Sequence, residues 1–276
     1  MYKHAIITGG SSGIGKAIAK LLVQSGSSIS IIARTQTKLD STKAELETLK
    51  IHPNQQILAI FADVSEREQI ESAIASAIMQ LGVPDLLITS AGIAHPGYFA
   101  ELPVAIFEQT MAINYFGTLY CIKAALPSMI QQRKGHIVAI SSGAGLIGLY
   151  GYTPYSPSKF AVRGLAESLR GELKTAGIDI SIVYPPDTDT PQLVAENKTK
   201  PLETKLITQS AQTMTAEKVA FDILLGIKRK AFVITPGIEM SLLMRFHSLF
   251  APILQWYFDR IVRRSRHIKE PNNNNA

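Results

Sequence analysis

The chain has 276 residues, 46% of them hydrophobic and 18% charged, and it carries a net charge of +6. This apolar content is enough for the core of one large α/β domain, and a charged fraction below the usual value of about 25% indicates an apolar patch on the surface. The single cysteine, Cys121, excludes an intramolecular disulfide and a cysteine-rich metal site, so we predict no bound metal and a reducing compartment.

Short apolar runs alternate with longer helical patterns through most of the sequence. The predicted strands are 4–8, 28–33, 56–61, 85–89, 136–141, 179–184 and 231–235. The predicted helices are 14–25, 37–50, 66–81, 103–132, 155–176 and 215–229. Repeated strand–helix–strand units favour a parallel sheet covered on both faces, and the strands are too few for an eight-stranded barrel. We therefore predict a doubly wound, Rossmann-like three-layer α/β sandwich with a seven-stranded parallel sheet.

A glycine-rich turn, TGGSSGIG, follows the first predicted strand. Gly9, Gly13 and Gly15 would let the backbone approach an anion, and the start of the next helix would present amide groups to a pyrophosphate. Glycine-rich turns also serve plain strand–helix packing. The position of this one, at the first strand–helix junction of an alternating fold, favours dinucleotide binding.

The end of the second predicted strand, IIARTQTK, bears on which dinucleotide is bound. An NAD-binding protein places an acidic residue there for the ribose hydroxyls. Here Arg34 and Lys38 follow the strand, and with Ser11 and Ser12 they would bind a 2′-phosphate, although a surface arginine after a strand is also common. The pattern favours NADP over NAD. After the third strand, the carboxylate of Asp63 could accept a hydrogen bond from the adenine amino group.

Four polar residues further along the chain form a candidate catalytic set. Tyr155 and Lys159 are four residues apart and share a helix face, where the ammonium would lower the tyrosine pKa from about 10 toward the range useful for acid–base catalysis. Ser142 could hold a substrate carbonyl in front of Tyr155, and Asn114 could anchor a water that relays protons to Lys159. Each residue alone also fits a chance spacing, a turn or a helix cap. Their joint appearance in this order favours catalysis.

These motifs resemble the short-chain dehydrogenase/reductase family over residues 4–190. The resemblance rests on TGGSSGIG, SAG, AINYFG and YSPSK, and it implies a nicotinamide-dependent oxidoreductase in which Asn114, Ser142, Tyr155 and Lys159 are catalytic. It also implies a homo-oligomer, either a dimer or a tetramer. The implied contacts to NADP(H) are Gly9, Ser11, Ser12, Gly13, Ile14, Gly15, Arg34, Lys38, Asp63, Val64, Ala91, Gly92, Tyr155, Lys159, Pro185, Thr188 and Thr190.

The loop after the sixth predicted strand, YPPDTDTPQLVAENKTKPLET, resembles one branch of that family. The branch reduces the keto group of a long-chain keto-amine lipid with NADPH, so we expect a substrate of this class. Asp187, Asp189 and Glu196 could place an acid near the substrate ammonium, although each is more simply explained as a solvated loop residue. A steroid, retinoid or other lipid ketone stays open as the substrate. A further alternative is that the protein is a non-catalytic, NADP-binding regulator.

The segment from Ile238 onward mixes apolar residues with much of the positive charge. Between Arg245 and Glu270, six basic and two acidic residues give 6 − 2 = +4 of the net charge of +6. Because Leu, Phe, Trp and Tyr lie among these charges, a membrane surface is favoured and no nucleic-acid partner is predicted. The charges and Pro252 argue against a spanning helix and predict two interfacial amphipathic helices. Packing on the chain's own domain or on a second subunit is the alternative.

We therefore divide the chain into a reductase domain, 1–236, a C-terminal amphipathic segment, 237–270, and a disordered tail, 271–276. The reductase domain includes a substrate-covering loop, 187–213. The first residues, MYKH, lead into a strand-like run and do not resemble a secretory signal. We expect a cytoplasmic protein with peripheral contact to the cytosolic face of a membrane.

Overall fold

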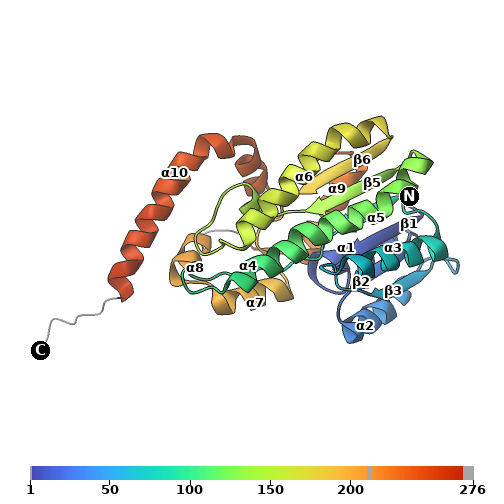
Figure 1. Ribbon diagram of the computed structural model, residues 1–276, viewed down its shortest axis with the longest axis horizontal. Coiled ribbons are helices and arrows are strands. Elements are labelled where there is room, and N and C mark those ends of the chain that lie inside the picture. Colours follow the sequence, from blue (N-terminus) through green and yellow to red (C-terminus); the bar gives the residue numbers. More distant parts are fainter. Residues whose placement is uncertain (1, 210–212, 270–276) are drawn as a thin grey trace, which may run out of the picture.

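A seven-stranded parallel sheet forms the middle layer of the computed structural model, which describes residues 2–209 and 213–269 (Figure 1). Its strands are β1 His4–Thr8, β2 Ser28–Ala33, β3 Ile57–Phe61, β4 Leu86–Thr89, β5 Gly135–Ile140, β6 Ile178–Val183 and β9 Val233–Ile234. They lie in the order β3-β2-β1-β4-β5-β6-β9. The predicted fold class is confirmed, and each predicted strand overlaps an observed one. The predicted tail, 271–276, lies outside the described residues.

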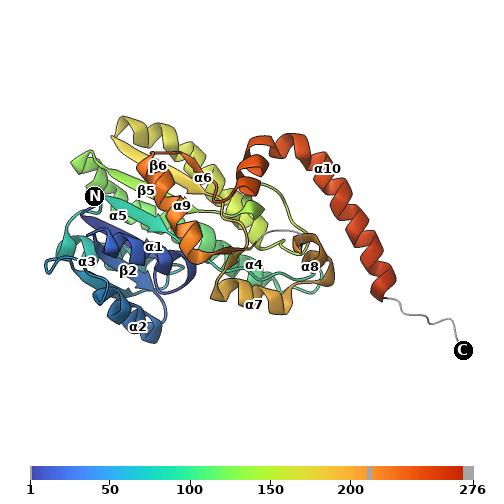
Figure 2. The same cartoon turned by 180° about the vertical axis from the view of Figure 1, so that it is seen from behind.

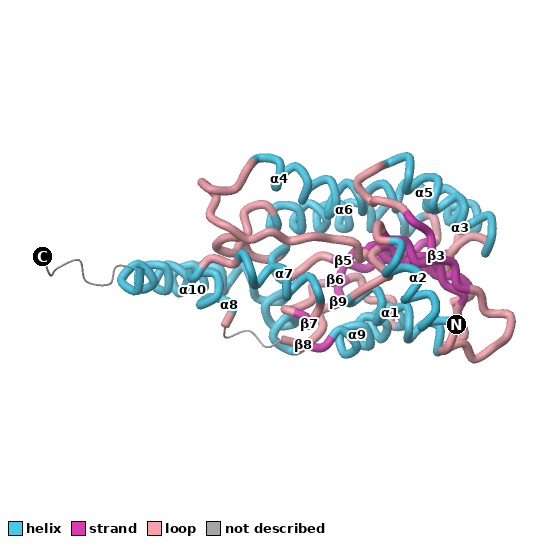
Figure 3. Tube along the Cα trace, turned by 90° about the horizontal axis from the view of Figure 1, so that it is seen from below, coloured by secondary structure: helices cyan, strands magenta, loops and turns pink. Residues whose placement is uncertain are grey.

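Helices cover both faces of the sheet, with α1, α2 and α9 on one side and α3, α5 and α6 on the other (Figure 3). These helices are α1 Gly13–Gln24, α2 Gln36–Glu47, α3 Arg67–Leu81, α5 Gly117–Gln132, α6 Tyr155–Thr175 and α9 Ala216–Lys228. The central strands read as continuous apolar runs because both of their faces are buried. The residues of β1, for example, are all buried.

The order of the sheet reverses between β1 and β4, which pair with Thr8 opposite Thr89. The turns that leave these two strands therefore start side by side at the carboxyl edge. In open α/β sheets, ligands bind in the crevice at such a switch point. The glycine-rich turn after β1 and the SAG segment after β4 lie there together.

The predicted long helix, 103–132, is interrupted by a π-helical turn. It consists of α4 Val104–Met111, the π turn η1 Ala112–Phe116 and α5. A π turn adds one residue to the helical ladder and changes the direction of the side chains that follow. Asn114 lies in this turn and is buried.

The predicted substrate-covering loop contains regular structure on both sides of residues 210–212, which lie outside the described part of the chain. Its elements are β7 Thr188–Asp189, α7 Pro191–Thr199, α8 Leu202–Thr208 and β8 Met214–Thr215. The strands β7 and β8 pair in parallel and form a second, two-stranded sheet. The domain boundaries at 236 and 270 stay predictions.

The C-terminal segment is one helix, α10 Ile238–Lys269, where the sequence predicts two (Figures 1 and 2). Pro252 lies inside it. A proline removes only its own N–H donor, so the hydrogen bonds of the flanking turns can continue the helix around it. The start of α10 packs on the core through Met240, and Ser265 near its end donates a hydrogen bond to Glu203 of α8 at 3.3 Å. None of the helices in the described residues is both long and apolar enough to cross a bilayer.

Candidate active site

Two adjoining cavities open at the carboxyl edge of the sheet. One reaches Arg34 and Lys38, and the other reaches Tyr155 and Lys159. They share four lining residues from the turns after β1 and β4, namely Gly9, Ser12, Ala91 and Gly92. The two cavities therefore form one extended cleft, which has the elongated shape that a dinucleotide requires.

The glycine-rich turn fits a dinucleotide phosphate group. A Cβ atom on Gly9, which has a positive φ of 68°, would lie 2.7 Å from the backbone nitrogen of Ala91. A Cβ on Gly15 would lie 2.5 Å from the carbonyl oxygen of Gly9. In the described residues, the N-cap Ser12 makes no side-chain bond to the first turn of α1. The amide groups of that turn are thus not capped by a side chain, and their binding of an anion stays a prediction.

The far end of the cleft contains the residues predicted to bind a 2′-phosphate. Ser11, Ser12, Arg34, Lys38, Asp63 and Val64 line the same cavity there. The half-exposed guanidinium of Arg34 lies 3.7 Å from the carboxylate of Asp63, a distance that leaves it free to bind a second anion. Although burial raises it, the pKa of Asp63 is held below its usual value by hydrogen bonds from Ser65 and by the charge of Arg34.

Three of the four predicted catalytic residues line the other cavity. Tyr155 is the first residue of α6, and Lys159 follows one turn later, with its ammonium 5.5 Å from the centre of the Tyr155 ring. The ammonium donates a hydrogen bond to the carbonyl oxygen of Ile140 at 3.0 Å. Its other two N–H groups remain for a ligand.

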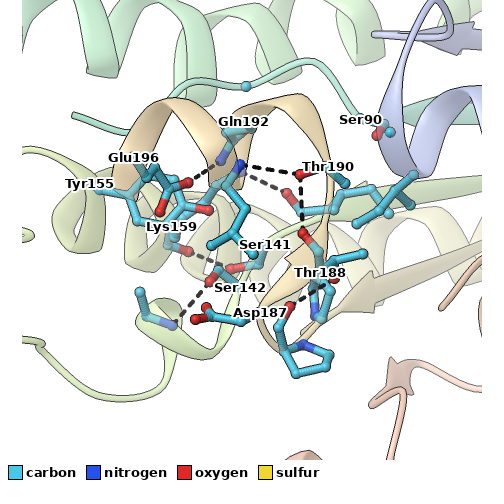
Figure 4. A pocket seen from close by; sticks show the side chains of 18 of the residues that line it. Ser90, Ser141, Ser142, Tyr155, Lys159, Asp187, Thr188, Thr190, Gln192 and Glu196 are labelled. Carbon is cyan, nitrogen blue, oxygen red and sulfur yellow. Dashed lines mark hydrogen bonds between the residues drawn. The ribbon is translucent and has the colours of Figure 1, made fainter. Parts of the chain in front are cut away.

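Ser142 follows β5 and is the N-cap of the short 3-10 helix η2 Gly143–Gly145. Its hydroxyl oxygen accepts a hydrogen bond from the backbone N–H of Ala144 at 3.2 Å. This bond uses an oxygen lone pair and leaves the hydroxyl proton free to be donated. Ser142 can therefore donate to a carbonyl oxygen placed between itself and Tyr155 (Figure 4).

Asn114 does not line either cavity in the described residues. Its side chain accepts from the backbone N–H of Ile93 and donates to the carbonyl oxygen of Ile93, both at 2.9 Å, and it also donates to Ser158 at 2.9 Å. Gly92 separates it from Lys159: a Cβ there would lie 3.2 Å from the amide oxygen of Asn114 and 3.5 Å from the Lys159 nitrogen. The helix-cap alternative for Asn114 is wrong, because the residue lies inside the π turn.

The pKa of Tyr155 is raised in the structure, where the sequence predicts that Lys159 lowers it. Burial is the main cause, the charge of Glu196 adds to it, and the side chains of Ser142 and Gln192 act in the opposite direction. Burial also lowers the pKa of Lys159 to about 8, because a desolvated ammonium is disfavoured. Tyr155 therefore carries its proton at neutral pH.

Three further side chains lie at the substrate end of the cleft. Tyr152 and Gln192 are not among the predicted site residues, whereas Glu196 is one of the three loop acids considered for the substrate ammonium. Tyr152 lies one turn before Tyr155, with their ring centres 5.7 Å apart, while Gln192 and Glu196 come from α7. Figure 4 shows Gln192 and Glu196 beside Tyr155. The sequence offers no signal for Tyr152 or Gln192. It also does not distinguish Glu196 from Asp187 and Asp189, because the burial of Glu196 depends on how the loop folds back.

The predicted cofactor residues of the loop after β6 also line the cleft, and one of them, Thr190, caps a helix as well. Pro185, Thr188 and Thr190 all face the Tyr155 cavity. The Thr188 hydroxyl donates to the carbonyl oxygen of Pro186 at 2.8 Å. Thr190 is the N-cap of α7 and accepts from the Leu193 N–H at 3.3 Å. Its methyl group also packs close to Gly13, where a Cβ would lie 3.0 Å away.

The fold and these residues define a short-chain oxidoreductase, and the sequence comparison agrees. Residues 3–201 match the family model described as short chain dehydrogenase. The chain belongs to the short-chain dehydrogenase family, as its motifs predict.

The chain is also similar to curated reductases that have more specific names than the family model. The chain is 47% identical over 218 residues to a 3-dehydrosphinganine reductase of Danio rerio, covering 79% of this chain and 66% of that one. It is 46% identical to a 3-ketodihydrosphingosine reductase of Mus musculus, over 80% of this chain and 67% of the relative. A relative of the same name from Dictyostelium discoideum is 41% identical, with 91% and 83% covered. The chain thus spans about two thirds of the length of the first two relatives.

Solved structures share the fold. A short-chain dehydrogenase/reductase of Burkholderia phymatum in complex with NAD superposes with a TM-score of 0.80 at 24% identity, covering 91% of this chain and 94% of that one. A short-chain dehydrogenase of Sphingobium yanoikuyae in complex with NADPH superposes with a TM-score of 0.77 at 23% identity, covering 99% and 98%. The second match covers nearly the whole chain, so its likeness in fold extends beyond residue 201, where the family match ends.

Proposed function

We propose that this protein reduces the keto group of 3-ketosphinganine to the alcohol of sphinganine, with NADPH as the reductant. The choice of substrate rests on the similarity to the 3-dehydrosphinganine and 3-ketodihydrosphingosine reductases, which are 41–47% identical to this chain over most of its length. The cleft supports the chemistry, because a tyrosine, a lysine and a serine meet beside a dinucleotide-shaped cavity. Bound NADPH would supply the hydride that the carbonyl carbon accepts.

Tyr155 is the proton donor of this proposal. Its raised pKa keeps the phenol protonated at neutral pH, so that it can protonate the carbonyl oxygen as the alcohol forms. Ser142 donates the second hydrogen bond to that oxygen and fixes its position. Lys159, whose pKa is about 8, is mostly protonated at pH 7 and stabilises the phenolate that Tyr155 leaves behind. Asn114 positions the segment after β4 through Ile93.

NADPH is proposed over NADH on the basis of the cations at the far end of the cleft. Arg34 and Lys38 line the cavity where a 2′-phosphate would lie, and Ser11 and Ser12 add hydroxyl donors. Asp63 is the one acidic residue in this lining among the described residues, and it is paired with Arg34. A doubly charged phosphate would add a second anionic partner for Arg34, whereas a ribose hydroxyl would leave it with Asp63 alone.

A substrate panel tests the proposal. The oxidation of NADPH is followed by absorbance with 3-ketosphinganine, a steroid ketone and a short-chain ketone, each at matched concentration. The proposal requires turnover with 3-ketosphinganine and a kcat/KM well above those of the other two. Preference for the steroid would support a different lipid-ketone reductase. Binding of NADPH without turnover of any ketone would support a regulator.

We also propose that α10 contacts a membrane surface. It exposes Ile238, Leu249, Ile253 and Trp256, each at 60% or more of its full accessibility. Arg260 lies over the Trp256 ring at 5.6 Å, so a cation and an aromatic side chain share one part of the helix. Such mixed faces bind to lipid headgroups at the membrane interface. A homo-oligomer, in which a second subunit covers this helix, is the competing proposal.

A further inference from the structure

A buried carboxylate lies in the substrate end of the cleft. Glu196 of α7 is 7% exposed and lines the same cavity as Tyr155, Lys159 and Ser142. It accepts hydrogen bonds from the hydroxyl of Tyr152 and from the amide nitrogen of Gln192, each at 2.8 Å. Both donors are neutral, so they solvate the carboxylate without balancing its charge.

Glu196 has no cationic partner in the described part of the chain. No lysine, arginine or histidine there forms an ion pair with it. The two nearby lysines have other partners. Lys159 donates to the carbonyl oxygen of Ile140, and Lys200 lies 3.8 Å from the other acid of the cavity, Asp187. Glu196 therefore forms no ion pair in the described part of the chain, and the Lys159 ammonium in the same cavity acts on its charge only from a distance.

An unpaired buried carboxylate is costly, and a fold that keeps one in a cleft commonly uses it for a ligand. We propose that Glu196 binds the protonated amine of the substrate, on the carbon next to the reacting carbonyl. This inference rests on the proposed function, whose substrate has an amine at that position. It assigns to Glu196 the role of selecting amino ketones over neutral lipid ketones.

The short distance between the amine and the carbonyl group of the substrate agrees with this assignment. In an α-amino ketone the nitrogen lies within about 3.6 Å of the carbonyl oxygen, because only three covalent bonds separate them. An amine recognition group must therefore lie next to the group that protonates the oxygen. Tyr152, which is hydrogen-bonded to Glu196, packs against the ring of Tyr155. The charge of Glu196 also raises the pKa of both Tyr155 and Lys159, as expected for a carboxylate close to the two.

Bound ammonium would change the electrostatics of the reacting groups. It neutralises the charge that holds the Tyr155 proton most strongly, and so makes that proton easier to transfer to the carbonyl oxygen. A neutral ketone in the same position would displace water from Glu196 and leave its charge uncompensated. Sites that leave a buried polar group unpaired with the wrong substrate discriminate strongly against it.

The test compares two ketones that differ only in the amine: 3-ketosphinganine and 1-hydroxyoctadecan-3-one. The selectivity ratio is the kcat/KM of the first divided by that of the second. Glu196→Gln keeps the size of the side chain and an oxygen that accepts from Tyr152. It should lower the ratio on the order of 10- to 100-fold, the effect of losing one charged hydrogen bond. Glu172→Gln makes the same substitution at an exposed position on α6, away from the cleft, and should leave the ratio unchanged.

An unchanged ratio in Glu196→Gln overturns the inference, whether both activities persist or both fall equally. A purely structural role predicts the equal fall. The pH dependence of the wild-type ratio gives a measurement that needs no folded variant. An amine next to a carbonyl, like a peptide α-amino group, titrates near about 8, so the ratio should fall as pH rises from 7 to 9. The titration of Lys159 affects both ketones and cancels in the ratio. A flat ratio contradicts the inference.

The proposed function and this inference can fail separately. If the wild type reduces 3-ketosphinganine and the selectivity ratio is unchanged in Glu196→Gln, the proposed function is supported and the inference about Glu196 is wrong. If the wild type reduces neither ketone, the function falls, and calorimetry decides the inference. Sphinganine should then bind to the NADP⁺-loaded protein more tightly than octadecane-1,3-diol, and Glu196→Gln should remove the difference. Equal binding of the two by the wild type overturns the inference.

Discussion

The side chain of Asn114 is hydrogen-bonded to both backbone polar groups of Ile93, accepting from the N–H and donating to the carbonyl oxygen at 2.9 Å each. Ile93 follows Gly92 in the segment after β4, and this segment lines the cleft. A side chain from the π turn therefore fixes the backbone at the switch point of the sheet. The third bond of Asn114, to Ser158 of α6, connects this segment to the helix that holds Tyr155 and Lys159.

Asn114→Ala should lower the free energy of unfolding by about 1–3 kcal/mol, because it leaves the N–H and the carbonyl oxygen of Ile93 without their side-chain partner. It also removes one hydrogen bond of Ser158, whose hydroxyl still donates to the carbonyl oxygen of Tyr155. Urea unfolding at pH 7 measures the loss. Asn54→Ala removes an exposed asparagine and serves as the control, which should change stability by less than about 0.5 kcal/mol. Equal stability of the two variants would show that the Asn114 bonds contribute nothing net.

Tyr155→Phe should lower kcat for ketone reduction by about 10²–10⁴-fold, because it removes the phenolic proton and keeps the ring. The affinity for NADPH, measured by fluorescence titration, should change little. Tyr257→Phe removes an exposed hydroxyl on α10 and should leave kcat unchanged. Substantial turnover by Tyr155→Phe would exclude the proposed proton donor.

Arg34→Asp should shift the cofactor preference toward NADH, because the new carboxylate would repel a 2′-phosphate and accept from ribose hydroxyls. We expect the ratio of kcat/KM for NADPH to that for NADH to fall at least about 10-fold, the effect of losing one charge-assisted hydrogen bond. Arg67→Asp makes the same charge change at an exposed position on α3 and is the matched control. A preference unaltered by Arg34→Asp would count against the 2′-phosphate assignment.

His136 should make the protein less stable in mild acid. Burial lowers the pKa of His136 to about 4 from 6.5, and its ring is hydrogen-bonded to Ser181 at 2.7 Å. Between pH 6.5 and 4 the unfolded chain binds a proton at this residue that the folded chain does not, so stability falls as pH falls through that window. Below pH 4 both states are protonated and the loss is complete, at about 3 kcal/mol.

The prediction for His136 is checked by urea unfolding at several pH values between 4 and 7. His136→Gln should show a smaller fall in stability over this window than the wild type. His52→Gln removes an exposed histidine and should keep the wild-type slope. Since His4 is also buried with a lowered pKa, the variant retains part of the acid sensitivity. Identical slopes for His136→Gln and the wild type would rule out this contribution.

The membrane contact of α10 is tested by flotation with liposomes. The double variant Leu249→Ser and Ile253→Ser should reduce binding to vesicles of anionic lipid, because it removes two exposed apolar side chains from the helix. Met79→Ser removes an equally exposed apolar side chain from α3 and should bind as the wild type does. Failure of the wild type to bind vesicles, together with a dimer in solution that the double variant dissociates, would favour the competing oligomer proposal.

The sequence was sufficient to predict the strands of the sheet and most of the helices that cover it. Buried parallel strands leave a clear pattern of continuous apolar runs bounded by turns, and each of these runs became a strand. The glycine turn could be assigned because positive φ values and close backbone approach leave few alternatives to glycine at Gly9. Tyr155 and Lys159 could be paired because helical spacing brings residues four apart to one face.

Other features depend on contacts between distant segments and leave no local pattern. The π turn at Asn114 could not be seen because its sequence is compatible with a plain helix. The pKa of Tyr155 was predicted in the wrong direction for two reasons. Its ring is buried against residues such as Ala94, Ala144 and Leu149, and the charge of Glu196 comes from α7, far along the chain. Glu196 itself looks like any acid of a polar loop until the loop folds over the cleft.

The short ladder between β7 and β8 pairs Thr188 with Met214 and Asp189 with Thr215. These two strands flank the segment that carries α7 and α8, of which residues 190–209 and 213 are described. The length and residues of this segment beyond Thr190 can vary without a change in the seven-stranded sheet or in the end of the cleft that contains Arg34 and Lys38. A change of substrate made in this segment would therefore leave the binding of the cofactor's far end as it is, whereas a change at Glu196 would also alter the pKa of Tyr155.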